Sequence, residues 1–371
     1  MPVPFIDLSR LTKEVSADVY ADWKECLDKC EFVGGPRVGE VEKKLRGILN
    51  VPHAISCANG TDALIVGLQA VGVKRGSKVA LPNLTFWATY EAVEILGATP
   101  ILIDIDENDL QMSFSEFKKA YEAHKFDAAL LVHLFGWASA QLSQFRAFCK
   151  EKGVHLVEDG AQCFGVTVNG EPVLSKAEIG TISFYPAKVI GGAMDGGAVT
   201  AQSEAHDKLL RSICNHGRSE HYSYAHIGWN SRMGGVQAAF LNRVLPLTEK
   251  VVASRKKAAE FYRKRLTEGS SRIRVYGAPA GVSENGYLSV ATVEGKTGPE
   301  LIEGLKAKGI GAGRVYPETM SVQPPAKNAI RFGSLERSTR FCERVVNLPL
   351  FYGITEAECE EAASALLSLV G

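Results

Sequence analysis

The chain lacks the features that direct a protein to a membrane, to a nucleic acid or out of the cell. Its 42 basic residues are matched by 42 acidic ones, so no net charge draws it to a polyanion. No apolar run approaches the roughly 20 residues of a membrane-spanning helix, and the apolar stretch 128–140 is short and contains His133. The N-terminal residues include neither a basic segment nor an apolar core, so we expect no export signal and a cytoplasmic location.

Patterns for metal, disulfide and dinucleotide sites are missing as well. None of the eight cysteines forms a CxxC pair or stands at zinc-finger spacing with a histidine, and Cys26 and Cys30, one helical turn apart, suit apolar packing. No GxxxxGK[ST] loop occurs, and Gly309, Gly311 and Gly313 follow an expected helix where a dinucleotide motif would follow a strand. We therefore expect a reducing compartment, no metal site and no nicotinamide cofactor.

What the chain does contain is a regular alternation of strand-like and helix-like segments. Short apolar runs that precede helical stretches lie at 54–58, 78–81, 100–105, 128–134 and 154–157. This alternation predicts a mainly parallel, doubly wound α/β sheet whose ligand lies at the carboxyl ends of the strands.

The C-terminal part has a different pattern, with a long helical stretch at 237–261 followed by shorter segments, among them an expected strand at 311–316. We expect two domains, a large α/β domain over residues 1–245 and a smaller α+β domain over residues 246–371. The basic residues of the long helix are most simply interpreted as a solvated face: Lys250, Arg255, Lys256 and Lys257.

Two ionisable residues stand where strands are expected to end. Asp159 follows the apolar run 154–157, and Lys188 lies in a glycine-rich loop between two further strand-like runs, 179–184 and 197–201. Taken singly, such an acid is more often a helix cap or ion-pair partner, and such a lysine is more often solvated. Pyridoxal phosphate, however, requires a lysine amine for covalent attachment and an acid for its ring nitrogen. The pair therefore predicts a pyridoxal phosphate site.

Two further segments fit such a cofactor but have ordinary explanations too. Gly60 and Thr61 open a helix after the first strand, and a helix N-terminus binds anions, although the same residues also suit a plain helix cap. Phe86 or Trp87 would stack on a flat ring, or would equally serve as a core residue.

With these motifs in order, the chain resembles the pyridoxal-phosphate-dependent sugar aminotransferases, the DegT/DnrJ/EryC1/StrS group of fold type I. The resemblance covers nearly the whole chain, and the residues that carry it include Gly60-Thr61-Asp62, Thr85-Phe86, Glu158-Asp159-Gly-Ala-Gln162, Ser183-Phe184 with Lys188, Asp195-Gly196-Gly197, Asn230-Ser-Arg232 and Tyr316-Pro317. It implies a fold type I α/β enzyme with a large cofactor-binding domain and a smaller C-terminal domain.

The resemblance also implies roles at the cofactor ring. Lys188 would hold the cofactor covalently, and Asp159 would pair with its pyridine nitrogen. Gln162 would lie near its phenolic oxygen, and Phe86 would stack on the ring.

The phosphate would be bound by both subunits of a homodimer. Gly60, Thr61 and Ser183 would hold it from one chain, and Asn230 would reach it from the neighbouring chain. Each active site would therefore need two copies of the protein.

The implied reaction transfers an amino group from an amino acid, usually L-glutamate, to a nucleotide-linked keto-sugar, which Arg232 and Tyr316 would face. The product would be an amino sugar for a surface polysaccharide, such as the O-antigen of lipopolysaccharide, or for a glycosylated metabolite. Val315 stands where many members have histidine, which leaves the substrate contacts of its loop open, and Gly160 stands where alanine is usual.

Neither the sugar nor the carbon that is aminated follows from the sequence, although 221–224 (His-Tyr-Ser-Tyr) resembles members that aminate C3. Two alternatives stay open. One is an aminotransferase for another cyclic ketone, such as a cyclitol ketone of the scyllo-inosose type. The other is a non-catalytic, pyridoxal-phosphate-binding regulator, which predicts a damaged lysine or acid or an added DNA-binding segment, and the chain has neither.

Overall fold

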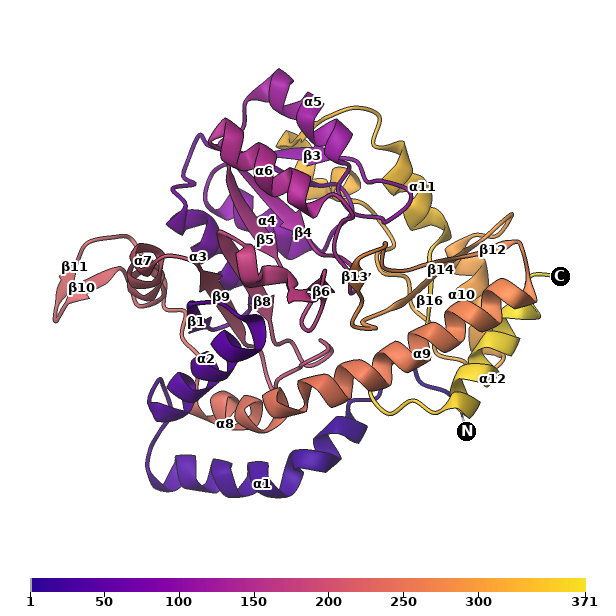
Figure 1. Ribbon diagram of the computed structural model, residues 1–371, viewed down its shortest axis with the longest axis horizontal. Helices are drawn as coiled ribbons and strands as arrows, with labels where there is room; N and C mark the ends of the chain where they lie inside the picture. The colour runs from indigo at the N-terminus through magenta and orange to yellow at the C-terminus, as the bar shows by residue number, and fades with distance from the viewer. Residues whose placement is uncertain (1) are drawn as a thin grey trace.

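The computed structural model describes residues 2–371 (Figure 1). Its centre is an eight-stranded sheet with the strand order β1-β9-β8-β5-β4-β2-β3-β15. These strands are β1 (His53–Cys57), β2 (Lys78–Pro82), β3 (Thr99–Ile103), β4 (Ala128–Val132), β5 (His155–Asp159), β8 (Ile179–Ser183), β9 (Gly197–Ala201) and β15 (Ile330–Arg331). Only β9 runs against its neighbours, so the expected mainly parallel α/β sheet is confirmed.

The large sheet is apolar on both faces because helices cover both of them. In β4, Ala129 and Leu131 pack into one apolar cluster while Ala128 and Leu130 pack into the other, as the alternation of side chains along a strand requires. One face carries α2 (Pro36–Leu49), α5 (Phe114–His124), α6 (Leu142–Lys152) and α8 (Gly235–Val244). The other face carries α3 (Gly60–Ala70), α4 (Trp87–Ile95) and α7 (Glu204–Cys214).

The C-terminal part builds a second, smaller sheet with an apolar cluster of its own. Its antiparallel strands, in the order β12-β14-β16, are β12 (Ile273–Tyr276), β14 (Ser289–Val293) and β16 (Val346–Leu348). Its helices are α9 (Thr248–Gly269), α10 (Gly298–Ala307), α11 (Glu336–Arg344) and α12 (Glu356–Leu367). This separate core supports the proposed division into residues 1–245 and 246–371, which three short segments cross: β15 joins the large sheet, residues 282–283 pair with residues 167–168, and Val3 packs in the smaller core.

Three elements lie outside the two sheets. Helix α1 (Ser9–Asp28) runs beside α8. A small sheet joins β6 (Thr167–Val168), β7 (Glu171–Pro172) and β13 (Val282–Ser283). The hairpin of β10 (Arg218–Glu220) and β11 (Ser223–Tyr224) projects from the body (Figure 1). None of the helices within residues 2–371 combines the length and the apolar character that crossing a bilayer would take.

The expected strand at 311–316 is wrong. The segment is irregular and forms a single bridge, between Gly313 and Asn347. The reason lies in its hydrogen bonds: the backbone N–H of Val315 donates to the side-chain oxygen of Asn347 (2.7 Å), and that of Gly311 donates to the carbonyl of Val3 (2.7 Å). Tertiary partners thus replace the strand ladder.

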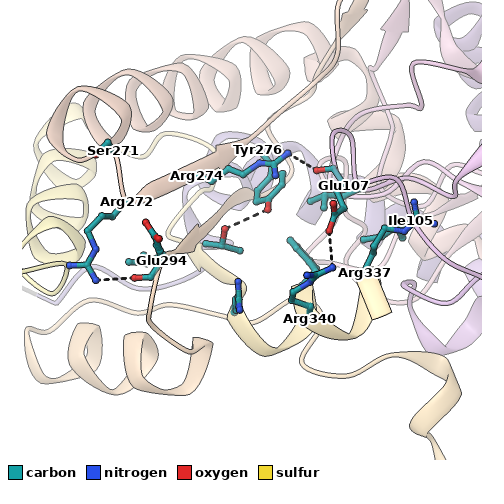
Figure 2. A pocket seen from close by; sticks show the side chains of 14 residues that line it. Ile105, Glu107, Ser271, Arg272, Arg274, Tyr276, Glu294, Arg337 and Arg340 are labelled. Carbon is teal, nitrogen blue, oxygen red and sulfur yellow. Dashed lines mark hydrogen bonds and ion pairs between the residues drawn. The ribbon is translucent and has the colours of Figure 1, made fainter. Parts of the chain in front are cut away.

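Arginines join the smaller sheet to the end of β3 (Figure 2). Arg274 of β12 donates to the carbonyl of Glu107 at 2.6 Å, and Arg340 of α11 pairs with the carboxylate of Glu107 at 3.2 Å. Arg337 pairs with Asp104 at 3.3 Å. The three arginines and Glu107 line a cavity of about 340 Å³, and none of the site residues expected from the sequence lines it.

A buried charge network holds the carboxyl end of β5. His133 and Glu158 are fully buried; His133 Nε2 lies 2.9 Å from Glu158 Oε2, and Arg146 of α6 donates to both carboxylate oxygens at 2.7 and 2.8 Å. Burial by itself raises the pKa of Glu158, but the hydrogen bonds from His133 and Arg146 outweigh it and hold that pKa below its usual value. The network fixes the strand end that carries Asp159.

We expect Arg146→Met to lower the free energy of unfolding by about 3–5 kcal/mol at neutral pH, because it leaves a buried carboxylate without its cation. The folded-state pKa of Glu158 lies below the unfolded value, so its stabilising contribution is present above the unfolded pKa and is lost as pH falls through the folded one. Urea unfolding across this range should show the wild type and the variant converging in acid. The exposed Lys150→Met on the same helix is the control; an Arg146→Met deficit that does not depend on pH would contradict this account.

Candidate active site

The carboxyl ends of β5 and β8 meet at one edge of the large sheet and carry the expected site residues. The two strands pair in parallel, with Asp159 opposite Thr181, and Ser183 is the last residue of β8. The loop that follows carries Lys188, whose backbone N–H donates to the carbonyl of Tyr185 (2.8 Å). The topology therefore brings Asp159, Ser183 and Lys188 to the same edge, as the sequence predicted.

Gln237 of α8 forms hydrogen bonds with the loop that carries Lys188. The Gln237 amide donates to the carbonyl of Met194 (2.7 Å) and accepts from the backbone N–H of Ala193 (3.1 Å). A Cβ on Gly192 would lie 2.0 Å from Gln237 Nε2, so only glycine allows this approach. The glycines of the loop thus serve to pack it on α8.

Asp159 is a buried carboxylate without a counterion. It is 4% exposed; Oδ1 accepts from the backbone N–H of Ala161 (3.0 Å) and Oδ2 from the hydroxyl of Thr89 (3.1 Å). Burial raises the pKa of Asp159, while the hydrogen bond from Ala161 and the charge of Lys188 act in the opposite direction. Within residues 2–371 no cation lies at ion-pair distance from it. A protonated pyridine nitrogen would supply the missing positive charge.

The N-terminus of α3 faces the end of β8 and forms a cradle for an anion. Asn59 caps the helix by accepting from the backbone N–H of Asp62 (2.8 Å), and Gly60 and Thr61 form its first turn. A Cβ on Gly60 would lie 2.6 Å from the Cβ of Ser183, so glycine is needed for this close approach. Backbone N–H groups of the first turn and the Ser183 hydroxyl are the donors that a phosphate group requires.

An exposed aromatic wall stands beside these groups. Phe86, just before α4, is 54% exposed, and its ring centroid lies 6.0 Å from that of Tyr316. Trp87 is partly buried and packs on Tyr90 (4.8 Å between centroids) against an apolar cluster, which leaves Phe86 as the exposed ring beside Tyr316. Gln162 donates to the Tyr316 hydroxyl (2.8 Å), which ties Tyr316 to the same wall.

The structure does not bring Asn230 and Arg232 into contact with these residues. Both side chains are exposed, and Arg232 hydrogen-bonds to Asn230 and, at 3.4 Å, to Asn215. In the described chain neither side chain forms a hydrogen bond with Lys188 or Asp159. Their position is compatible with the implied role in a neighbouring subunit and does not test it.

Sequence reasoning missed three residues of this site. Thr89 bonds to Asp159 across 70 positions of sequence, and the ring of Tyr287 lies 5.2 Å from the Lys188 ammonium. Arg255, expected on a solvated face, is 7% exposed, so that expectation is wrong. Arg255 falls on the apolar stripe of α9 between Val251 and the buried alanines one turn later, a helical spacing that would have indicated burial.

These features together fit pyridoxal phosphate. A lysine amine, a buried acid in need of a cation, an anion cradle and an exposed aromatic face converge on one sheet edge. No cluster of His, Cys, Asp and Glu suited to a metal ion occurs within the part of the chain that the structure describes.

Comparisons with known proteins find sugar aminotransferases over nearly the whole chain. The model of the DegT/DnrJ/EryC1/StrS aminotransferase family matches residues 13–367. The chain is 29% identical, over 98% of its length and 97% of the relative's, to the UDP-N-acetyl-3-dehydro-alpha-D-glucosamine 3-aminotransferase of Acidithiobacillus ferrooxidans. It is 29% identical, over 98% and 99% of the two lengths, to the UDP-2-acetamido-2-deoxy-3-oxo-D-glucuronate aminotransferase of Pseudomonas aeruginosa. The crystal structure of NtdA from Bacillus subtilis with bound cofactor PMP superposes with a TM-score of 0.92 at 25% identity, covering 100% of this chain and 85% of that one.

For the cofactor-free protein we expect Asp159→Asn to raise the melting temperature at neutral pH by about 2 °C or more, because it removes a buried, uncompensated charge. Burial raises the folded-state pKa of Asp159, so the destabilisation is complete above that pKa and disappears as pH falls below the unfolded value. Scanning calorimetry over this pH range measures the difference.

With saturating pyridoxal phosphate, the wild type should have a higher melting temperature than Asp159→Asn, since the wild-type carboxylate then gains its cation. If Asp159→Asn were no more stable than the wild type without cofactor, or if the cofactor stabilised both proteins equally, the role assigned to Asp159 would be wrong.

Proposed function

The chain belongs to the DegT/DnrJ/EryC1/StrS aminotransferase family, and from this premise we propose that it transfers an amino group from L-glutamate to the ketone of a nucleotide-linked sugar. It is an aminotransferase of fold type I that uses pyridoxal phosphate. The single observation that carries the site assignment is the buried Asp159 carboxylate, which lacks a counterion in the described chain and shares a sheet edge with Lys188.

Lys188 and Asp159 divide the proton chemistry of the proposed reaction. When bound, pyridoxal phosphate supplies an electron-withdrawing ring that stabilises negative charge on the carbon that carries the amine. Lys188 would anchor the cofactor through Nζ, and once released, the same Nζ would take the proton from that carbon and deliver it to the cofactor. Asp159 holds the ring nitrogen in its protonated form, and Thr89 and Ala161 keep the carboxylate oriented.

The other groups position the cofactor. Gly60, Thr61 and Ser183 bind the phosphate at the N-terminus of α3. Phe86 stacks on the ring, and Gln162, fixed by the backbone N–H of Phe135 (2.6 Å) and by Tyr316, lies beside the phenolic oxygen.

We propose a UDP-linked 3-keto sugar as the acceptor, with Arg232 and Tyr316 facing it. The names of the two relatives, each of which specifies a UDP sugar with an oxo group at C3, support this choice, as does the stretch 221–224. A cytoplasmic location is supported by the cysteines, all eight of which are free.

The proposed unit is a homodimer with shared active sites, in which Asn230 of one chain reaches the phosphate bound by the other. The hairpin projects from the body (Figure 1). Tyr222 in the hairpin is 76% exposed and Ile227 in the segment behind it is 87% exposed, which is unusual for apolar side chains on a free surface. A second copy of the chain would cover them.

We expect the holoenzyme to consume L-glutamate when a UDP-linked 3-keto sugar is supplied, and Lys188→Ala to abolish this turnover. Borohydride should fix the cofactor to the wild type and not to Lys188→Ala, as mass spectrometry of the intact protein would show. A panel that also contains 4-keto sugar nucleotides and a cyclitol ketone separates the alternatives. Turnover with the cyclitol ketone alone would refute the sugar assignment, and wild type without a lysine-linked cofactor would refute the enzyme mechanism.

Mixed dimers test the shared site. Lys188→Ala and Asn230→Ala proteins, each inactive alone, should recover about one quarter of wild-type activity when they are unfolded together and refolded, since half the dimers then hold one intact site. Refolded single variants serve as controls. Failure to recover activity, with heterodimers confirmed by two affinity tags, would place Asn230 in the site of its own chain or outside it.

A further inference from the structure

A cavity of about 330 Å³ opens on the side of Lys188 that faces the N-terminal segment and α9. Its walls are mostly apolar and come from Phe5, Leu8, Leu11 and Phe351. Lys188 and Arg255 are the basic side chains that line it, and because the Lys188 amine holds the cofactor, Arg255 is the cation left for a ligand. An apolar cavity with such a cation is a place for a small organic anion.

Arg255 is held rigidly, yet it keeps one nitrogen free. Its Nε donates to the carbonyl of Gly286 (3.0 Å), and its Nη2 donates to those of Tyr287 (3.0 Å) and Leu350 (3.1 Å). Nη1 forms no hydrogen bond within residues 2–371, and Arg255 lines the cavity. The guanidinium is thus fixed in orientation with a donor group left for a ligand.

The charge of Arg255 is uncompensated as well. The residue is 7% exposed, burial lowers its pKa to about 10, and no carboxylate of the described chain lies at ion-pair distance. The nearest candidate on the cavity wall, Asp7, is already bonded to Ser9 (2.9 Å) and Arg10 (3.1 Å). A buried guanidinium without a counterion is costly, and an anion that enters the cavity would offset that cost.

One turn of chain connects this cation to the reacting lysine. The carbonyl of Tyr287 accepts from Arg255, while its ring lies 5.2 Å from the Lys188 ammonium. The turn is fixed by the fully buried Asn285, whose side chain accepts from the backbone N–H of Tyr287 (2.9 Å) and donates to the carbonyl of Gln162 (2.9 Å). Tyr287 therefore contacts both residues: its carbonyl oxygen accepts from Arg255, and its ring lies over Lys188.

We propose that Arg255 binds a carboxylate of the amino-acid donor, so that the donor's amine faces Lys188. The inference rests on the proposed aminotransferase function and adds its donor side. The donor is an α-amino acid with a short aliphatic chain and a second carboxylate or a small polar end: its methylene groups pack on the apolar wall, and its acid group provides the counterion that Arg255 lacks. Arg255 is a substrate-binding residue in this scheme, distinct from the groups that hold the cofactor.

Binding of glutarate to the holoenzyme tests this without turnover, because glutarate carries the two acid groups and no amine. Calorimetric titration should show at least about 30-fold weaker binding for Arg255→Met than for the wild type, the loss expected when one partner of a buried charge pair is truncated. Arg265→Met makes the same change on the same helix at a side chain that pairs with Glu360, away from the cavity, and should bind glutarate as the wild type does. Equal binding by Arg255→Met and the wild type would overturn the proposal.

The second test needs no acceptor. Conversion of the bound cofactor to its amino form is followed by absorbance with L-glutamate, its α-amide and its γ-amide as donors. For the wild type, one of the two amides should lose at least about 30-fold in kcat/KM, and Arg255→Met should make acid and amide nearly equal. If neither amide is impaired, or if the penalty is the same in the variants, Arg255 does not bind the donor.

These experiments distinguish failure of the donor proposal from failure of the proposed acceptor and from loss of folding. Failure of every keto-sugar nucleotide would refute the acceptor while leaving the donor half-reaction and the glutarate titration to decide on Arg255. Where Arg255→Met does not fold, glutarate and its monoamide are compared on the wild type: preference for the diacid supports the proposal, and equal binding overturns it.

Discussion

The site is organised by a carboxylate that the protein buries and does not neutralise. Asp159 accepts hydrogen bonds from Thr89 and Ala161, and neither donor carries a charge. A buried ionised acid in such surroundings lowers the stability of the cofactor-free fold until a cation pairs with it. The neighbouring Glu158 shows the contrast, because His133 and Arg146 satisfy it fully within the chain. One acid is neutralised within the chain, and the next has no cation at ion-pair distance among residues 2–371.

A second buried charge, of positive sign, also lacks a counterion near the reacting lysine. Arg255 is a buried cation whose partners are three carbonyl groups, and it faces a cavity that Lys188 also lines. Asp159 and Arg255 are thus a buried acid and a buried cation near Lys188, each without an ion-pair partner among the described residues. The first suits the ring nitrogen of a cofactor, and the second suits the acid group of a donor. The segment 285–287, from the C-terminal part of the chain, supplies the link between them.

Part of this arrangement could be read from the sequence because its causes are local. Asp159 and Lys188 follow buried strands, and parallel strands bring their carboxyl ends to one edge, so alternation and spacing were enough to place both. The choice between Phe86 and Trp87 was not local: both are aromatic and adjacent, and only packing on Tyr90 assigns Trp87 to the core. The strand expected at 311–316 failed for the same reason, since hydrogen bonds to Val3 and Asn347 replaced a ladder that local propensity favoured.

The sequence by itself determined the fold class and placed Asp159 and Lys188 at strand ends, because periodicity, glycine and strand-end acids act over a few positions of chain. The tertiary structure alone decided which polar groups remain without a partner. Thr89 reaches Asp159 across 70 positions, and Arg255, which its charge suggested was solvated, lies inside against carbonyl groups 31, 32 and 95 positions away. Whether a charge is compensated depends on everything packed around it, and no short stretch of sequence contains that information.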